Sequence, residues 1–357
     1  IAAGKVLGED VSEYEALYAD IVTAFQQTWP VYHTQTECIL AAHFHLAKDC
    51  QAAADQLAKL VTDCGIQLKT GFVGTPYLLH VLSDYGYASL AWSLLLRENY
   101  PSWLYPVTKG ATTIWEHWDG IMENGDFWST DMNSFNHYSY GVVSEWMFRY
   151  VGGIEADETQ PGFKHIILQP TPDFRTAFPT GQKRITQAKA SHLSGYGRIS
   201  SEWQYKEDGR ISYTATVPAN TTATLYLPLM EKTDNITESG KDLKEAEGVD
   251  FKGIVDGKAV IELQSGTYQF DMEKGSPDRV EESTSPNLRI HPNPFCDRLH
   301  LSCSEDIRYA SVTACNGQIL YRQHRGGNID TSAWAPGIYV VRVDTPEHSY
   351  TEKAIKK

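Results

Sequence analysis

The sequence lacks both a CxxC pair and any long run of apolar residues. Its cysteines are spread along the chain, at positions 38, 50, 64, 296, 303 and 315. Cysteines two residues apart are a common zinc signature, so their absence argues against a zinc site, and we expect neither a metal nor an organic cofactor. A helix that crosses a bilayer needs ~18 or more consecutive apolar residues, so we expect no membrane span.

Positive charge is also scarce. Lys and Arg total 31 against 45 Asp and Glu, which gives a net charge of −14 and a pI near 5.3. Such a balance repels the phosphates of nucleic acids and of anionic lipids, and it suits a protein that handles neutral substrates. The sequence therefore predicts no nucleic-acid partner.

The chain opens with Ile1 instead of a methionine, and its first residues have no signal-peptide pattern. We therefore expect a piece of a longer protein, from which features missing here were cut away.

The cysteines leave two interpretations open. The three in helical segments read as plain thiols, whereas one pair among Cys296, Cys303 and Cys315 would form a disulfide if the protein is exported.

The first 160 residues have the pattern of helices joined by loops. Apolar residues in 12–29 recur near the 3.6-residue period, and Pro30 ends that segment. Antiparallel helices that alternate short turns with long functional loops, such as 69–75 and 103–136, indicate an α/α toroid. The further segments with a helical pattern are 36–47, 52–64, 76–85, 87–96 and 139–151.

Near Pro161 the apolar period changes to two, which makes the whole chain a multidomain α+β protein. We assign 161–272 to an antiparallel β-sandwich, 273–285 to an exposed charged linker, and 286–357 to a small Ig-like β domain. Strand patterns cover 164–169, 189–193, 198–206, 210–217, 221–227 and 259–263, and in the last domain 299–302, 310–314, 319–322 and 337–343. Hairpin turns are expected at Asp208-Gly209, Asp256-Gly257 and Asn316-Gly317.

The segment 110–136 combines indoles and carboxylates. Glu116 stands between Trp115 and Trp118, and Asp119 follows directly. Indoles stack on pyranose rings, and carboxylates titrate or bind sugar hydroxyls, so the cluster is typical of a carbohydrate site, catalytic or not. Plainer interpretations stand beside this one: an acid bonded to an indole for Glu116, a turn or cap for Asp119, solvated loop acids for Asp126 and Asp131, and packing for Trp103, Trp128, Tyr77 and His80.

Three ordered motifs, TGFVGT at 70–75, YPSW at 100–103 and GATTIWE-x-WD at 110–119, resemble the C-terminal half of the catalytic barrel of bacterial α-L-rhamnosidases, glycoside hydrolase family 78. The resemblance runs from about Tyr14 to Asp173 and continues through the sandwich. It implies that 1–160 is the second half of an (α/α)6 barrel. The implied activity is the removal of terminal α-L-rhamnose from glycans or glycosides with inversion.

The resemblance also assigns roles to single residues. The Glu of the TIWE segment is the family's general base, which corresponds to Glu116, and a His in the SFNHYS segment contacts the sugar, which corresponds to His137. Trp115 and Trp118 are expected to line the pocket, and Asp119 to orient a neighbour of Glu116 or to contact sugar hydroxyls. For His137, a core histidine bonded to backbone is the plainer alternative.

The family's general acid, a Glu in an upstream motif rich in Asp, Arg and Glu, has no counterpart before Glu116. Glu9, Glu13 and Glu15 stand on an ordinary amphipathic helix. We therefore predict that this chain is inactive by itself and that its helices expose faces which the missing half would cover. Alternatives are a fragment that binds rhamnosyl glycans without cleaving them, another (α/α)6 glycosidase or a sugar lyase, or a structural half-domain.

The tail has a resemblance of its own. The stretch 290–294 (IHPNP), the Asn-Gly hairpin, the segment APGIYVVRV at 335–343 and the basic end at 353–357 resemble a type IX secretion C-terminal sorting domain. Such domains carry cargo across the outer membrane of Bacteroidota. The resemblance implies the type IX machinery as a partner and a secreted or cell-surface location.

Overall fold

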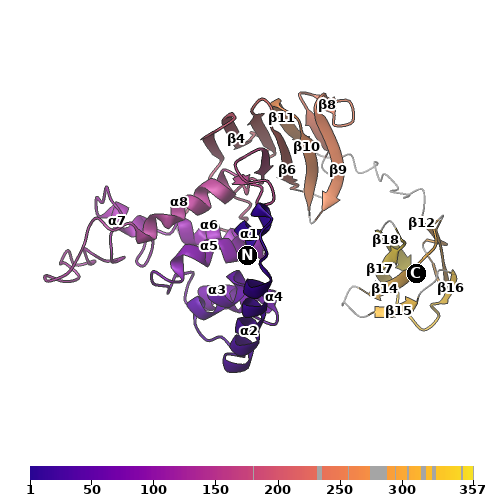
Figure 1. Cartoon of the computed structure of the whole chain (residues 1–357), viewed down its shortest axis with the longest axis horizontal. Coiled ribbons are helices and arrows are strands. Elements are labelled where there is room, and N and C mark those ends of the chain that lie inside the picture. Colours follow the sequence, from indigo (N-terminus) through magenta and orange to yellow (C-terminus); the bar gives the residue numbers. More distant parts are fainter. Residues whose placement is uncertain are drawn as a thin grey trace. The chain divides into compact units, whose positions relative to one another are not determined.

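The structure is a computed structural model of the chain. It describes all residues except 180, 231–234, 256, 274–287, 294, 304, 315–318, 324–326, 347–348 and 357. The chain divides into two compact units, Ile1–Ser276 and Pro277–Lys357 (Figure 1). The expected turns at Asp256-Gly257 and Asn316-Gly317, and all but the first residue of the expected linker, fall wholly or partly on residues outside this description.

The first unit is mainly helical up to residue 151 and rich in sheet after it (Figure 1). Its helices are α1 (Ala2–Leu7), α2 (Ser12–Thr28), α3 (Gln35–His43), α4 (Cys50–Asp63), α5 (Thr75–Asp84), α6 (Ala88–Leu95), α7 (Leu104–Thr108) and α8 (Val143–Trp146). Helix α8 lies between a 3₁₀ turn, η1 (Ser139–Val142), and a π turn, η2 (Met147–Val151). The helix predicted at 139–151 therefore has the predicted bounds, but its hydrogen-bond pattern changes twice along its length.

Short polar motifs determine where two of these helices begin. The Thr34 side chain accepts the N–H of Glu37, whose carboxylate accepts the N–H of Thr34 in return, so a capping box starts α3. The Asp49 carboxylate accepts the N–H of Ala52 at 2.9 Å and caps α4. No helix among the described residues is long and apolar enough to cross a membrane.

Helix α2 differs from its neighbours because none of its residues is buried. Several of its apolar side chains face solvent, since Tyr14 is 61% exposed, Leu17 55% and Ile21 49%, whereas Phe25 near its end packs against the core. Helices α4 and α5, by contrast, contribute fully buried residues such as Leu57 and Leu78 to the core. Much of the stripe that makes α2 amphipathic in the sequence is thus left exposed by the part of the chain that the structure describes.

Two sheets follow in the first unit. One has the strand order β1-β2-β6-β10-β9 and the other β3-β4-β5-β11-β7-β8, and both contribute buried residues to the same hydrophobic cluster. Their strands are β1 (Ile154–Ala156), β2 (His165–Leu168), β3 (Gln187–Ser194), β4 (Gly197–Tyr205), β5 (Ile211–Val217), β6 (Thr222–Pro228), β7 (Asn235–Glu238), β8 (Lys241–Asp242), β9 (Val249–Val255), β10 (Lys258–Leu263) and β11 (Gly266–Glu273). The prediction of a wholly antiparallel domain needs one correction, because β2 pairs with β6 in parallel. A long connection separates these two strands in sequence, as a parallel pair requires.

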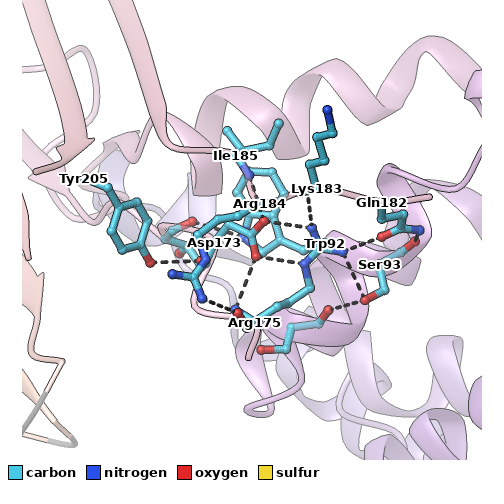
Figure 2. A network of polar contacts seen from close by, with 11 residues as sticks. Trp92, Ser93, Asp173, Arg175, Gln182, Lys183, Arg184, Ile185 and Tyr205 are labelled. Carbon is cyan, nitrogen blue, oxygen red and sulfur yellow. Dashed lines mark hydrogen bonds and ion pairs between the residues drawn. The ribbon is translucent and has the colours of Figure 1, made fainter. Parts of the chain in front are cut away.

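A buried ion pair lies between the helices and the sheets (Figure 2). The Arg175 guanidinium donates to both oxygens of Asp173 at 2.8 Å, and Asp173 also accepts the N–H of Ile185 at 3.0 Å. From the helical part, Ser93 of α6 accepts from Arg175 at 3.4 Å, while Tyr205 of β4 donates to the carbonyl of Asp173 at 2.9 Å. The network therefore connects both parts of the first unit.

The second unit holds two antiparallel sheets, with orders β12-β13-β16 and β15-β14-β17-β18. Its core is a separate cluster around Phe295, Leu299, Val312 and Val341, all fully buried. Its strands are β12 (Leu288–His291), β13 (Arg298–Cys303), β14 (Tyr309–Ala314), β15 (Ile319–Gln323), β16 (Gly327–Asp330), β17 (Gly337–Asp344) and β18 (Ser349–Lys356). Cys296 and Cys303 are free, and Cys315 lies outside the described residues.

Candidate active site

The candidate site is built on two loop segments that pair with each other. The N–H of Glu116 donates to the carbonyl of Ser134 at 2.9 Å, and the N–H of His137 donates to the carbonyl of Ile114 at 2.8 Å. Thr113 adds a side-chain hydrogen bond to the carbonyl of Phe135. This short antiparallel pairing brings Glu116 and His137 onto neighbouring chain segments, although 20 residues separate them in sequence.

Glu116 is half-buried and one of its oxygens has a fixed partner. Its Oε2 accepts the N–H of Ser134 at 3.2 Å, so the side chain and backbone of Glu116 both bind the same residue. A carboxylate oriented in this way has its second oxygen available to another group. This arrangement suits a carboxylate that accepts a proton.

His137 contacts two parallel rings and a backbone N–H, and the more distant ring is that of Tyr138, at 5.6 Å. Its imidazole lies parallel to the ring of Phe72, with centroids 4.9 Å apart and an angle of 7°, and the N–H of Ser139 approaches Nδ1 at 3.3 Å. An Nδ1 that accepts a hydrogen bond carries no proton, so the neutral ring has its proton on Nε2. His137 can therefore donate a hydrogen bond from Nε2, for example to a hydroxyl.

Trp118 is packed into an aromatic group. Its indole stacks on Tyr140, with centroids 3.7 Å apart and an angle of 14°, and meets Trp103 edge to face at 5.4 Å. The Trp103 Nε1–H donates to the carbonyl of Tyr140 at 2.9 Å, which supports the packing role expected for Trp103. The Trp118 Nε1–H is buried and has no hydrogen-bond partner among the described residues.

Trp115 and Asp119 lie in different surroundings. Trp115 is only 5% exposed and packs edge-on against Phe135, so its ring supports the loop and has little surface for a ligand. Asp119 lines a cavity of about 340 Å³ together with Tyr100 and Tyr105. Burial, followed by the Asp119 carboxylate, raises the pKa of Tyr100.

Three residues near these positions were not picked out by the sequence. Tyr140 is buried, and its pKa is raised by burial first and then by Tyr100 and Glu116. Phe72 contacts both His137 and Tyr140. Gly120 has little room for a side chain, since a Cβ there would lie 3.1 Å from both Phe135 and Trp115, and these rings would have to shift slightly. The only signal for Phe72 was its place in the TGFVGT motif.

The remaining candidates behave as follows. Asp126 and Asp131 are exposed, in agreement with their interpretation as loop acids. Trp128 stacks on His117 at 3.6 Å. His80 was expected to be a packing residue, but its Nε2 lies 2.6 Å from Glu145, and the resulting hydrogen bond lowers the pKa of Glu145. No group of three His, Cys, Asp or Glu among the described residues is arranged to hold a metal ion.

Comparison with known proteins divides the chain into three matches. Residues 1–151 match the bacterial alpha-L-rhamnosidase 6 hairpin glycosidase domain, and residues 153–242 match the bacterial alpha-L-rhamnosidase C-terminal domain. Residues 289–357 match the secretion system C-terminal sorting domain. A sorting domain of this kind indicates secretion or a cell-surface location.

Individual relatives agree with these matches. An alpha-L-rhamnosidase of Streptomyces avermitilis is 36% identical over 272 residues, which cover 74% of this chain and 24% of the relative. One from Formosa agariphila is 36% identical over 281 residues, 74% of this chain and 28% of that protein. The crystal structure of the S. avermitilis enzyme complexed with L-rhamnose superposes with a TM-score of 0.66 at 35% identity, covering 76% of this chain and 25% of that one.

The chain thus spans about a quarter of the length of the curated relatives it matches. Within that quarter, the matches run without a large gap through the segment that holds Glu116 and His137 and into the two sheets. Residues 1–242 therefore belong to the bacterial α-L-rhamnosidase family, and a secretion sorting domain follows them in the same chain.

Proposed function

We propose that this chain is the C-terminal portion of an exported glycoside hydrolase that removes terminal α-L-rhamnose with inversion. The observation that carries the proposal is the pairing of 113–116 with 134–137, which places an oriented carboxylate and a histidine on adjacent segments. This pairing lies inside the match to the 6 hairpin glycosidase domain. The substrates would be rhamnose-containing glycans or glycosides.

In the proposed mechanism, Glu116 acts as the general base. It takes a proton from a water molecule, which attacks the anomeric carbon on the face opposite the leaving group. An inverting enzyme leaves room for that water by separating its two carboxyl groups by ~6.5–9.5 Å. The hydrogen bond from Ser134 holds one oxygen of Glu116, so the other can face the water.

The neighbouring residues would bind the sugar. His137 would donate from Nε2 to a hydroxyl, and Asp119 would accept from another at the edge of its cavity. Trp118 would form part of the wall with Tyr140 behind it. We give Trp115 a supporting role, because its ring is almost fully buried against the loop.

The general acid would come from a part of the enzyme that this chain does not contain. We propose that residues 1–160 are the second half of an (α/α)6 barrel and that the two sheets form a β-sandwich. The exposed apolar residues of α2 support the first of these proposals, because a complete barrel would bury them. The type IX secretion machinery would recognise the sorting domain.

A chimera tests the assignment of Glu116. Residues 1–276 would replace the matching stretch of the S. avermitilis relative, which supplies the rest of an α-L-rhamnosidase. We expect the chimera to hydrolyse an aryl α-L-rhamnoside and Glu116→Gln to lower its kcat by roughly 10²–10⁴-fold, the usual contribution of a general base. Asp131→Asn, an exposed acid of the same loop, is the matched control and should leave kcat unchanged.

Azide identifies the role of the lost carboxylate. In the Glu116→Ala chimera, azide needs no deprotonation, so it can attack the anomeric carbon while the aglycone leaves with a proton from the general acid. The expected product is a rhamnosyl azide of inverted configuration. Hydrolysis by the isolated chain 1–357, or full activity of Glu116→Gln, would contradict the proposal.

A further inference from the structure

Phe72 occupies an unusual position for an exposed aromatic residue. Its side chain is 43% exposed, yet its ring lies parallel to the His137 imidazole, with an angle of 7° between the two planes. The same ring meets Tyr140 at 5.0 Å, and Tyr140 carries the Trp118 indole on its surface at 3.7 Å. Phe72 thus contacts both His137 and the Tyr140 ring on which Trp118 stacks, and it does so from a loop about 40 residues upstream of Glu116.

The loop around Phe72 is held firmly at its base. The buried hydroxyls of Thr70 and Thr75 hydrogen-bond to each other at 2.8 Å, and the N–H of Thr75 donates to the carbonyl of Gly71 at 3.0 Å. At Gly74, a Cβ would lie 2.6 Å from the Thr36 hydroxyl, so this loop packs directly against α3. Both ends of the segment that carries Phe72 are therefore fixed to helices of the core.

The stack complements the hydrogen bond at Nδ1. The N–H of Ser139 determines which nitrogen of His137 carries the proton, but one hydrogen bond does not by itself fix the plane of the ring. Tyr138 also lies parallel to the imidazole, but its centroid is farther away, at 5.6 Å, and its side chain is 88% exposed. A flat contact on the face of the imidazole restricts rotation of the ring, and aromatic contacts of this kind are directional. Phe72, the nearer of the two parallel rings, thus acts with Ser139 to define both the plane of the imidazole and the direction of Nε2.

We propose that Phe72 is a positioning residue for His137, and that it keeps Nε2 pointed at the bound sugar. The part of this inference that concerns the sugar rests on the proposed function, whereas the positioning of the ring can be measured without a substrate. Phe72 acts through His137, and the TGFVGT segment acquires a role at the site through this contact. An aliphatic side chain at position 72 removes the nearer of the two parallel rings and loosens the imidazole, whereas a tyrosine keeps the stack.

Nuclear magnetic resonance of the full chain tests the positioning directly. With ¹⁵N-labelled histidine, the two ring nitrogens of His137 are assigned by their loss in His137→Gln and followed at pH 8, where an ordinary imidazole is neutral. We expect the wild type to show an Nε2–H tautomer. Phe72→Leu should give a mixture of tautomers and a downfield shift of the His137 ring protons, because the ring current of Phe72 is lost, and Phe72→Tyr should restore both signals.

Phe44→Leu is the matched control. Phe44 has nearly the same exposure, 44%, and contacts His43 rather than His137, so this variant should leave the His137 signals in place. Near-ultraviolet circular dichroism reports whether each variant keeps its fold, and Phe72→Met replaces Phe72→Leu if that variant does not. A folded Phe72→Leu or Phe72→Met variant with unchanged His137 signals would overturn the proposal, as would Phe44→Leu causing the same change.

Titration with L-rhamnose, followed by tryptophan fluorescence, separates this inference from the proposed function. If the half-site binds the sugar, Phe72→Leu should weaken binding roughly 2- to 10-fold, the range expected for loss of one aromatic contact, and Phe72→Tyr should recover it. If the wild type binds no rhamnose while the His137 signals still respond to Phe72→Leu, the positioning stands. The sugar-binding role of this half-site then fails.

Discussion

Asp173 and Arg175 show what a buried charge requires of its neighbours. Both side chains are almost completely buried, and every oxygen of the carboxylate receives a hydrogen bond (Figure 2). Burial by itself raises the pKa of Asp173, but the hydrogen bonds from Arg175 and Ile185 and the guanidinium charge outweigh it and lower the pKa. The pair therefore stays ionised at neutral pH.

Removing one member of this pair should be costly. Asp173→Asn leaves the Arg175 charge buried without a counter-ion, so we expect the free energy of unfolding of the first unit at pH 7 to fall by about 3–5 kcal/mol. Urea denaturation measures the loss, and Asp131→Asn, which removes an exposed acid, should change it by less than about 0.5 kcal/mol. Equal effects of the two substitutions would show that the buried network contributes no more to the free energy of unfolding than an exposed acid does.

The pH dependence follows from the direction of the shift. Because the folded pKa of Asp173 is lowered, its stabilisation is complete above the unfolded value, near 3.9, and is lost as the pH falls through the folded pKa. The difference between wild type and Asp173→Asn should therefore stay constant from pH 7 to about 5. It should shrink only in more acidic solution.

At the residue scale, the sequence identified Glu116 and His137 as candidates but not how the fold brings their segments together. The motif names the residue types, whereas the pairing of 113–116 with 134–137 depends on a long loop that has no periodic pattern. Phe72 lies too far upstream for spacing to connect it with His137. The proximity of these three residues is a tertiary property.

Among the elements, regular apolar periods predicted most helices within a few residues. The change of winding within 139–151, which the apolar period did not predict, has a tertiary cause. Trp146 donates to the Ser83 hydroxyl at 2.9 Å and the Tyr150 hydroxyl donates to Asp84 at 2.5 Å, so two large side chains are anchored to adjacent residues of α5. The backbone widens into a π turn after Trp146, as helices often do where tertiary contacts compete with regular winding.

Strands without alternation were missed for a similar reason. Strand β9 lies at the edge of its sheet and has no buried residue, so no alternate set of its side chains faces the core. It is recognised only by its pairing with β10. Strands β5 and β10, in contrast, alternate buried and half-buried residues along their length and were predicted from that pattern.

Helix α2 permits a prediction at this scale. Leu17 is 55% exposed, so Leu17→Ala should change the free energy of unfolding by less than about 0.5 kcal/mol. Leu57→Ala, the same substitution at a fully buried position of α4, should cost about 2–5 kcal/mol. A urea midpoint for Leu17→Ala as low as that of Leu57→Ala would show that α2 is covered in the isolated chain. In the chimera, where the remaining helices are present, we expect Leu17→Ala to become destabilising.

For the whole molecule, the two compact units have separate cores. The cluster of the first unit runs from Cys38 to Met272 and that of the second from Leu288 to Ala354, with no shared residue. A domain with its own core is expected to unfold as its own cooperative unit. A sorting domain that folds by itself can be joined to different cargo proteins without changes to their cores.

This independence can be measured by removing the tail. We expect a protein that ends at Ser276 to unfold at the same urea midpoint as the first unit does within the full chain, because the core of that unit loses no residue. Val341→Ala, in the core of the second unit, should lower only the transition of that unit, by about 2 kcal/mol or more in unfolding free energy. Tryptophan fluorescence reports mainly on the first unit, and Trp334 is the indole that packs in the second. A single transition that shifts with both changes would mean that the tail and the rhamnosidase portion stabilise each other, and the sorting domain would then not be an independent module.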